Sequence, residues 1–117
     1  MTAQGHPRAI FQRAIERQNL AVAEAVLRAE IPRPTLVDLL ELTALIAQKD
    51  PGRRSRVVVR WLARWLEATP HAVIWDVAFV TAALQALGTA NHLRALEALR
   101  DVAERASGAP SARRIAS

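Results

Sequence analysis

The stretch that decides the fold is Asp50-Pro-Gly-Arg-Arg-Ser-Arg-Val-Val-Val-Arg-Trp-Leu-Ala-Arg-Trp-Leu-Glu-Ala-Thr-Pro70. Asp50 before Pro51 is typical of a helix start, because the aspartate caps the first turn and proline at the first helical position gives up no hydrogen bond. At a period of 3.6 residues the large apolar side chains share one face, namely Val58, Trp61, Leu62, Trp65 and Leu66. The opposite face carries Arg53, Arg56, Arg60 and Arg64. The pattern predicts an amphipathic helix over residues 51–68 whose two tryptophans pack inward against other helices.

Proline and glycine divide the rest of the chain into segments that also have helical periodicity. We expect helices at 7–18, 20–30, 35–48, 51–68, 70–87 and 90–106, and no strand. Only Asn19 separates the first two, so they form one helix or two. Thr35 and Asp38 make a variant capping box, Thr69 is the expected N-cap of the 70–87 helix, and Gly88 is its expected C-cap.

The fold class that these segments predict is all-α, with five or six helices in antiparallel hairpins at about 7–30, 35–68 and 70–106. Such hairpins form a compact helical bundle or a short α-solenoid-like stack. With 117 residues the chain has the size of one domain. We expect that domain at 1–106 and a disordered basic tail at 107–117, where apolar residues are few.

Two helices carry expectations about the core. The 70–87 helix is apolar nearly all round, with Asp76 and Gln85 as its strongly polar interruptions, which predicts that it is the central and most buried helix. In the 90–106 helix the inward positions are expected to be Leu93, Leu96, Leu99 and Ala103. Its charged residues are expected to face outward and to form ion pairs with one another: Glu97, Arg100, Asp101, Glu104 and Arg105.

Few residues point to catalysis or to metal binding. Cysteine and tyrosine are absent from the sequence. His6, His71 and His92 have no usable metal-ligand partner at helical spacing, and each is expected to be exposed or to cap a helix. Asp38 and Glu41 are expected on a solvated face, without the burial that shifts a catalytic pKa. We therefore expect no enzyme, no catalytic residue, no metal and no cofactor, and no small-molecule substrate is evident.

The charge balance gives a weak indication of partners. The net charge is +5, but fifteen of the sixteen basic residues are arginine, an excess that a GC-rich genome produces without functional selection. The first residues lack the apolar stretch of a signal peptide, and the most apolar run is too short to span a bilayer. We expect a cytoplasmic protein without a membrane span.

Two features suggest nucleic-acid binding. The arginine ridge of Arg53, Arg54, Arg56, Arg60 and Arg64 has the spacing to follow a phosphate backbone, although the polar face of any amphipathic helix is charged, and we favour this simpler interpretation. Residues 20–48 resemble a helix-turn-helix, with Glu30 at the usual turn glycine. The second helix of that motif would present Val37, Asp38 and Glu41 to DNA, a set unsuited to reading bases.

The sequence analysis favours a non-catalytic protein-interaction module, an adaptor or scaffold, that binds a protein partner or associates with itself. Helical hairpins without catalytic polar groups are generic scaffolds for this role. The alternative is a nucleic-acid-binding protein that uses the arginine ridge or, less favoured, the helix-turn-helix.

Overall fold

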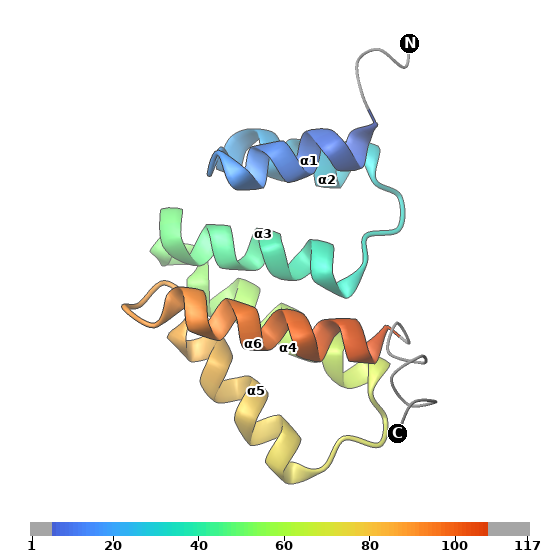
Figure 1. Ribbon diagram of the computed structural model, residues 1–117, viewed down its shortest axis with the longest axis vertical. Coiled ribbons are helices and arrows are strands. Elements are labelled where there is room, and N and C mark those ends of the chain that lie inside the picture. The colour runs from blue at the N-terminus through green and yellow to red at the C-terminus, as the bar shows by residue number, and fades with distance from the viewer. Residues whose placement is uncertain (1–5, 108–117) are drawn as a thin grey trace.

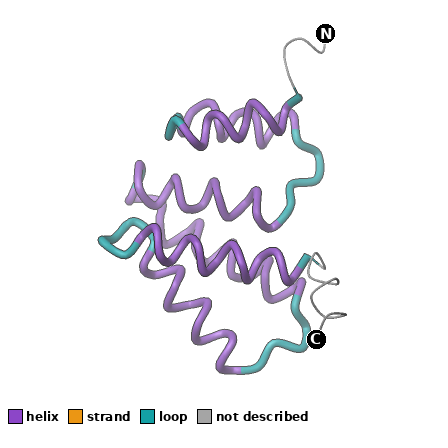
Figure 2. The backbone as a smooth tube through the Cα atoms, in the orientation of Figure 1, coloured by secondary structure: helices purple, strands orange, loops and turns teal. Residues whose placement is uncertain are grey.

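The computed structural model describes residues 6–107, and this part of the chain folds into helices without strands (Figures 1 and 2). The all-α prediction is confirmed. The expected tail at 107–117 lies outside the described residues except for Ser107. In chain order the elements are α1 (Pro7–Glu16), α2 (Leu20–Glu30), α3 (Leu36–Lys49), the short 3-10 turn η2 (Pro51–Arg53), α4 (Arg54–Ala68), α5 (Ile74–Ala86) and α6 (His92–Ala106).

The helix ends follow the capping chemistry of the sequence in most places. α1 and α2 are separate, because Gln18 has a φ of 56° and the Asn19 side chain accepts a hydrogen bond from the Val22 amide. The capping box of Thr35 and Asp38 is present at the start of α3. The expected N-cap at Thr69 is wrong: its hydroxyl donates to the Trp65 carbonyl at the end of α4, and α5 begins only at Ile74.

Gly88 ends the α5 segment as expected, and its place in the fold allows no other residue. Its φ is +82°, which residues with a Cβ rarely adopt. A Cβ at this position would lie 2.7 Å from the carbonyl oxygen of Ala47 in α3. The turn between α5 and α6 is therefore pressed directly against the end of α3.

The helices pair as three hairpins, α1 with α2, α3 with α4 and α5 with α6, as the sequence predicted. In Figure 1 the α1/α2 hairpin lies at the top, α3 lies in the middle, and α6, α4 and α5 lie below it. α3 contacts α1 and α2 on one side and α6 on the other, in addition to its hairpin partner α4. It is thus the central helix.

Two apolar cores meet at α3. The smaller is built on Phe11, Ala23 and Leu27 of the first hairpin and includes Leu45 of α3. The larger joins α3 to α4 and to the last hairpin and contains Trp61 and Trp65, so the prediction that both tryptophans pack inward is confirmed. The indole N–H of Trp61 donates to the Leu36 carbonyl over 3.0 Å, which fixes α4 against the start of α3.

The prediction that the 70–87 helix is the central one is wrong. Within α5 only Val80 and Leu84 are buried, whereas Ile74 is 70% and Trp75 is 78% exposed. Figure 1 shows the reason: α5 lies at the edge of the molecule and diverges from α6 toward its own N-terminal end, so no other helix covers its outer side. Leu93 of α6 was also expected inside and is 78% exposed.

Candidate interaction surfaces

Two carboxylates are buried on the central helix. Asp38 and Glu41 are 3% and 7% exposed, which corrects the expectation that they lie on a solvated face. Asp38 pairs with Arg8 of α1, and Glu41 accepts two hydrogen bonds from Arg100 of α6, one of them over 3.1 Å. Each arginine comes from a different flanking helix, and each is only about half covered. These pairs join α3 to its neighbours, since a buried carboxylate without its cation is costly.

His92 is also buried, which corrects the expectation of an exposed histidine, although it does make a local capping contact. Its Nδ1 accepts a hydrogen bond of 2.8 Å from the Gly88 amide. Burial lowers the pKa of His92 below its ordinary value, and the nearby positive charge of Arg100 lowers it further, against the opposing effect of Glu41. His92 is thus a neutral structural residue of the α5–α6 turn at neutral pH.

The structure divides the five arginines of the predicted ridge into two groups. Arg53 donates two hydrogen bonds to Glu24 of α2, over 2.7 and 3.1 Å, and a third to Asp50. Arg54 donates to the Leu87 carbonyl over 3.2 Å. Both are therefore committed to contacts within the chain. Arg56, Arg60 and Arg64 are exposed and have no ion pair among the described residues.

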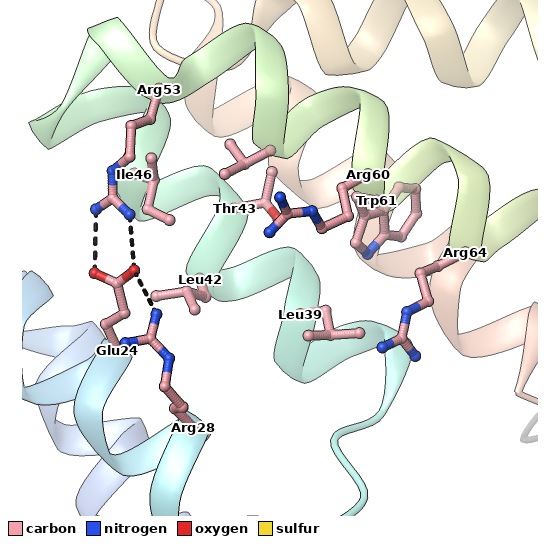
Figure 3. A pocket seen from close by; sticks show the side chains of 11 residues that line it. Glu24, Arg28, Leu39, Leu42, Thr43, Ile46, Arg53, Arg60, Trp61 and Arg64 are labelled. Carbon is pink, nitrogen blue, oxygen red and sulfur yellow. Dashed lines mark hydrogen bonds and ion pairs between the residues drawn. The ribbon is translucent and has the colours of Figure 1, made fainter.

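Arg60 and Arg64 border a groove between α2, α3 and α4, which Figure 3 shows from close by. The groove has a volume of about 190 Å³, and its apolar side is formed by Leu39, Leu42, Ile46, Val57 and Trp61. Its charged border consists of Arg28, Arg53, Arg60 and Arg64, against the single acid Glu24. Arg56 does not line it. Glu24 and Arg28 come from α2, a helix whose connection with the ridge is not visible in the sequence, because only the fold brings α2 and α4 to the same groove on α3.

At one end of this groove Glu24 forms an ionic cluster with Arg53 and Arg28. Its carboxylate contacts Arg53 and, over 3.3 Å, Arg28. The hydrogen bond from Arg53, together with the charges of both arginines, holds the pKa of Glu24 below its ordinary value. The carboxylate therefore stays ionised at neutral pH, and Arg60 and Arg64 at the other end have no such partner among residues 6–107.

The residues proposed for a helix-turn-helix are not available to DNA. The second helix of that motif would be α3, which is the central helix of the fold. Asp38 and Glu41 are buried in ion pairs, and Val37 packs at the edge of the larger core. A recognition helix must lie in the major groove with its side chains exposed, and α3 has no free face of that kind.

Three strongly exposed large hydrophobic side chains, Ile74, Trp75 and Phe79, lie on α5. Its outward side presents Ile74, Trp75, Ala78, Phe79, Ala82 and Gln85, in which Gln85 is the one polar side chain. We call these residues the α5 face. Beside it runs a shallow trough between α5 and α6, lined mainly by alanines: Ala82, Ala83, Ala86, Ala95 and Ala98, with Phe79, Asn91 and Arg94. The sequence analysis identified the apolar character of this helix but assigned it to the core.

Comparison with known proteins gives no family for this chain: no family model, no curated protein and no solved structure matches it. Within the described part of the chain, no helix is both long enough and apolar enough to cross a membrane. No group of three or more metal-ligating side chains lies together among residues 6–107. The function has to be argued from the two surfaces themselves.

Proposed function

We propose that this protein is a non-catalytic protein-interaction module that associates with a second copy of itself through the α5 face. The observation that carries this proposal is the exposure of Ile74, Trp75 and Phe79 on one side of a single helix, at 70%, 78% and 53%. Contiguous apolar surface of this kind is uncommon on proteins that act alone and typically marks an interface. Large aromatic side chains also contribute most to the affinity of such interfaces.

Charge favours a second copy as the occupant. The chain carries a net charge of +5, so two copies repel each other wherever their basic surfaces meet. Among the helices of the described residues, α5 alone contains no basic side chain. The α5 face is therefore the surface on which two copies approach with the least repulsion.

Shape favours the same pairing. With the twofold axis perpendicular to α5, the two α5 helices of a symmetric dimer run antiparallel, and each copy offers the same patch to the other. This arrangement brings Trp75, near the start of one α5, opposite Ala82 and Ala86, near the end of the other. The alanine-lined trough then receives the indole ring, and the contact is made twice.

Sedimentation analysis of matched variants tests the proposal. Trp75 and Leu93 are equally exposed, at 78%, but Leu93 lies outside the α5 face. At about 100 μM we expect the wild type and Leu93→Glu to sediment as dimers, at twice the 12.8 kDa of one chain. We expect Trp75→Glu to sediment as a folded monomer, because a buried carboxylate without a partner is costly. A monomeric wild type, or a dimer that Trp75→Glu leaves intact, would show the proposal to be wrong.

Nucleic-acid binding through α4 is the second candidate, because Arg56, Arg60 and Arg64 stay exposed and unpaired among the described residues. With Arg53 and Arg54 engaged inside the chain, at most three ridge arginines are left for phosphates. The logarithm of the affinity should then fall with the logarithm of salt concentration with a slope of about −3. Arg60 and Arg64, however, border an apolar groove, which a phosphate backbone does not use.

A further inference from the structure

We infer that the groove between α2, α3 and α4 binds an acidic amphipathic helix of a partner protein. The helix would place apolar side chains on Leu39, Leu42 and Ile46 and carboxylates on Arg60 and Arg64. This surface is separate from the α5 face, since no residue of α5 or α6 lines the groove. The inference adds a partner to the interaction module proposed above and does not depend on its self-association.

The apolar side of the groove has the pattern of a helix-packing surface. Leu39, Leu42 and Ile46 are spaced by three and four residues, the pattern with which one helix packs against another. All three side chains line the groove, with Leu39 and Leu42 partly exposed and Ile46 3% exposed at its floor, although α3 is otherwise the most covered helix. From Leu39 to Ile46 this ridge is about 10 Å long, two helical turns. A partner helix therefore has room for two or three apolar anchors.

The border of the groove is positively charged. Four arginines border the groove and Glu24 is its one acid, so the surface attracts a negatively charged ligand. Arg60 and Arg64 lie four residues apart on α4, and Figure 3 shows both side chains extending from α4 toward α3. A spacing of four residues corresponds to about 6 Å along a helix axis. Carboxylates at positions i and i+4 of a partner helix match that spacing.

At the end of the groove away from Arg60 and Arg64, the chain itself supplies a carboxylate, that of Glu24. Arg53 holds Glu24 through two nitrogen–oxygen hydrogen bonds of 2.7 and 3.1 Å, the forked geometry that favours arginine as a carboxylate partner. Arg60 and Arg64 present the same guanidinium chemistry without an acid among the described residues. The positive charge of the groove is thus partly neutralised at the Glu24 end. At the end with Arg60 and Arg64 it has no acidic partner among the described residues.

The combination favours a peptide over a nucleic acid. Phosphates in a duplex are contacted by cations on an open surface and make no use of a partly exposed apolar ridge. An amphipathic helix uses both the ridge and the cations. The ligand class can therefore be decided by removing the apolar part and the acidic part of a probe separately.

The probe is a fluorescein-labelled synthetic helical peptide with leucines at i, i+3 and i+7 on one face and glutamates four residues apart beside them. One control peptide has serine in place of the leucines, and a second has glutamine in place of the glutamates. A 20-base-pair DNA duplex is the fourth ligand. Binding is measured by fluorescence anisotropy at physiological salt on the full chain and, separately, on Trp75→Glu, so that failure of self-association does not affect the result.

The protein variants are matched in charge and spacing. Arg60→Gln/Arg64→Gln removes the open pair of the groove. Arg13→Gln/Arg17→Gln removes two exposed arginines four residues apart, in and just after α1, which do not line the groove and have no ion pair among the described residues. We expect the groove variant to raise the Kd for the acidic peptide by about tenfold or more and the control variant by less than about threefold. We also expect both control peptides to bind at least about tenfold more weakly than the probe.

Three results would overturn the inference. The first is a DNA duplex that binds more tightly than the acidic peptide and loses affinity in Arg60→Gln/Arg64→Gln, which would assign these arginines to nucleic acid. The second is equal binding of the leucine and serine peptides, which would mean that the apolar ridge has no role. The third is the absence of any peptide binding by a chain whose circular dichroism shows that it is folded.

Discussion

α3 and α5 are of similar length, and their positions in the fold are the reverse of what their composition suggests. α3 contains Asp38 and Glu41, yet eight of its fourteen residues are buried. α5 has Asp76 as its one charged residue, yet only two of its thirteen residues are buried. The more polar helix is at the centre of the fold, and the more apolar one lies at its edge.

The order of the hairpins explains this reversal. α3 opens the middle hairpin, so it has neighbours on both sides, and two of them supply the arginines that neutralise its carboxylates. α5 opens the α5/α6 hairpin, and the described chain has no further helix after this hairpin that could cover α5. Composition therefore indicates how much apolar surface a helix has, while the position in the stack decides whether this chain or another molecule covers it.

The largest expected effect comes from equivalent truncations in the two helices. Leu40→Ala in α3 removes a side chain that is fully buried and should lower the free energy of unfolding by about 2 to 5 kcal/mol through loss of burial and a cavity. Ile74→Ala in α5 removes a side chain that is 70% exposed and should cost less than about 0.5 kcal/mol in the monomer. Urea denaturation of both variants in the Trp75→Glu background measures these values without a contribution from association.

Equal losses at the two positions would contradict the assignment of α3 as the central helix. A large loss at Ile74 alone would restore the expectation, drawn from the sequence, that the 70–87 helix forms the core. That expectation would place Ile74 in the core, and the 70% exposure of its side chain removes the reason for it.

The sequence predicted the features that depend on neighbours along the chain. The helix class, the hairpin pairing, the capping box at Thr35 and the inward orientation of Trp61 and Trp65 arise from local spacing and are confirmed. The late start of α5 was missed because Thr69 has two possible uses, as an N-cap for the next helix or as a partner of the preceding turn, and the fold uses the second.

The sequence did not predict the features that depend on contacts between hairpins. Arg53 meets Glu24 across 29 residues, and Arg100 meets Glu41 across 59. No helical period relates these positions, so the arginine ridge was interpreted as one surface and Glu41 as solvated. The absence of basic residues from α5 was visible in the sequence, and it was the available signal that this helix differs from the others.

A smaller effect should come from the ion pair that joins α3 to the last hairpin. Arg100→Met keeps most of the side-chain volume but leaves the buried Glu41 without its cation, and we expect a loss of about 1 to 3 kcal/mol in the free energy of unfolding. The control is Arg105→Met, whose ion pair with Asp101 lies within α6 and is exposed on both sides, so that its loss should cost less than about 1 kcal/mol. Urea denaturation at neutral pH compares the two.

Losses of the same size for Arg100→Met and Arg105→Met would mean that Glu41 gains little from its partner. The contrast between a central helix held by ion pairs and an edge helix that has none among the described residues would then lose its energetic basis. A larger loss of unfolding free energy for Arg105→Met would mean that the surface pair of Arg105 and Asp101 within α6 contributes more than the buried pair of Arg100 and Glu41.

The smallest expected effect concerns pH, and it arises where the α5–α6 turn meets α3. The pKa of His92 in the folded chain lies below the ordinary value of 6.5, first because of burial and then because of Arg100. As the pH falls, the unfolded chain therefore takes up this proton before the folded chain does. The stability that neutral His92 provides is complete above about pH 7 and decreases as the pH falls through 6.5 toward the lower folded-state pKa. Glu24, whose pKa is lowered from 4.5, begins to lose its contribution only below that range.

The variant His92→Asn isolates this effect, because an amide oxygen near the position of Nδ1 still accepts from the Gly88 amide but does not titrate. Between pH 7.5 and pH 5 the wild type should lose part of its stability advantage over His92→Asn, by less than the cost of Arg100→Met. His6 and His71 are present in both chains and cancel in the difference. A stability difference that stays constant over this range would mean that folding leaves the pKa of His92 unchanged, and one that grows as the pH falls would mean that folding raises it. In the second case the turn would be held to α3 by a charged contact with Glu41, and the neutral hydrogen bond to Gly88 would not be the link between the edge of the fold and its centre.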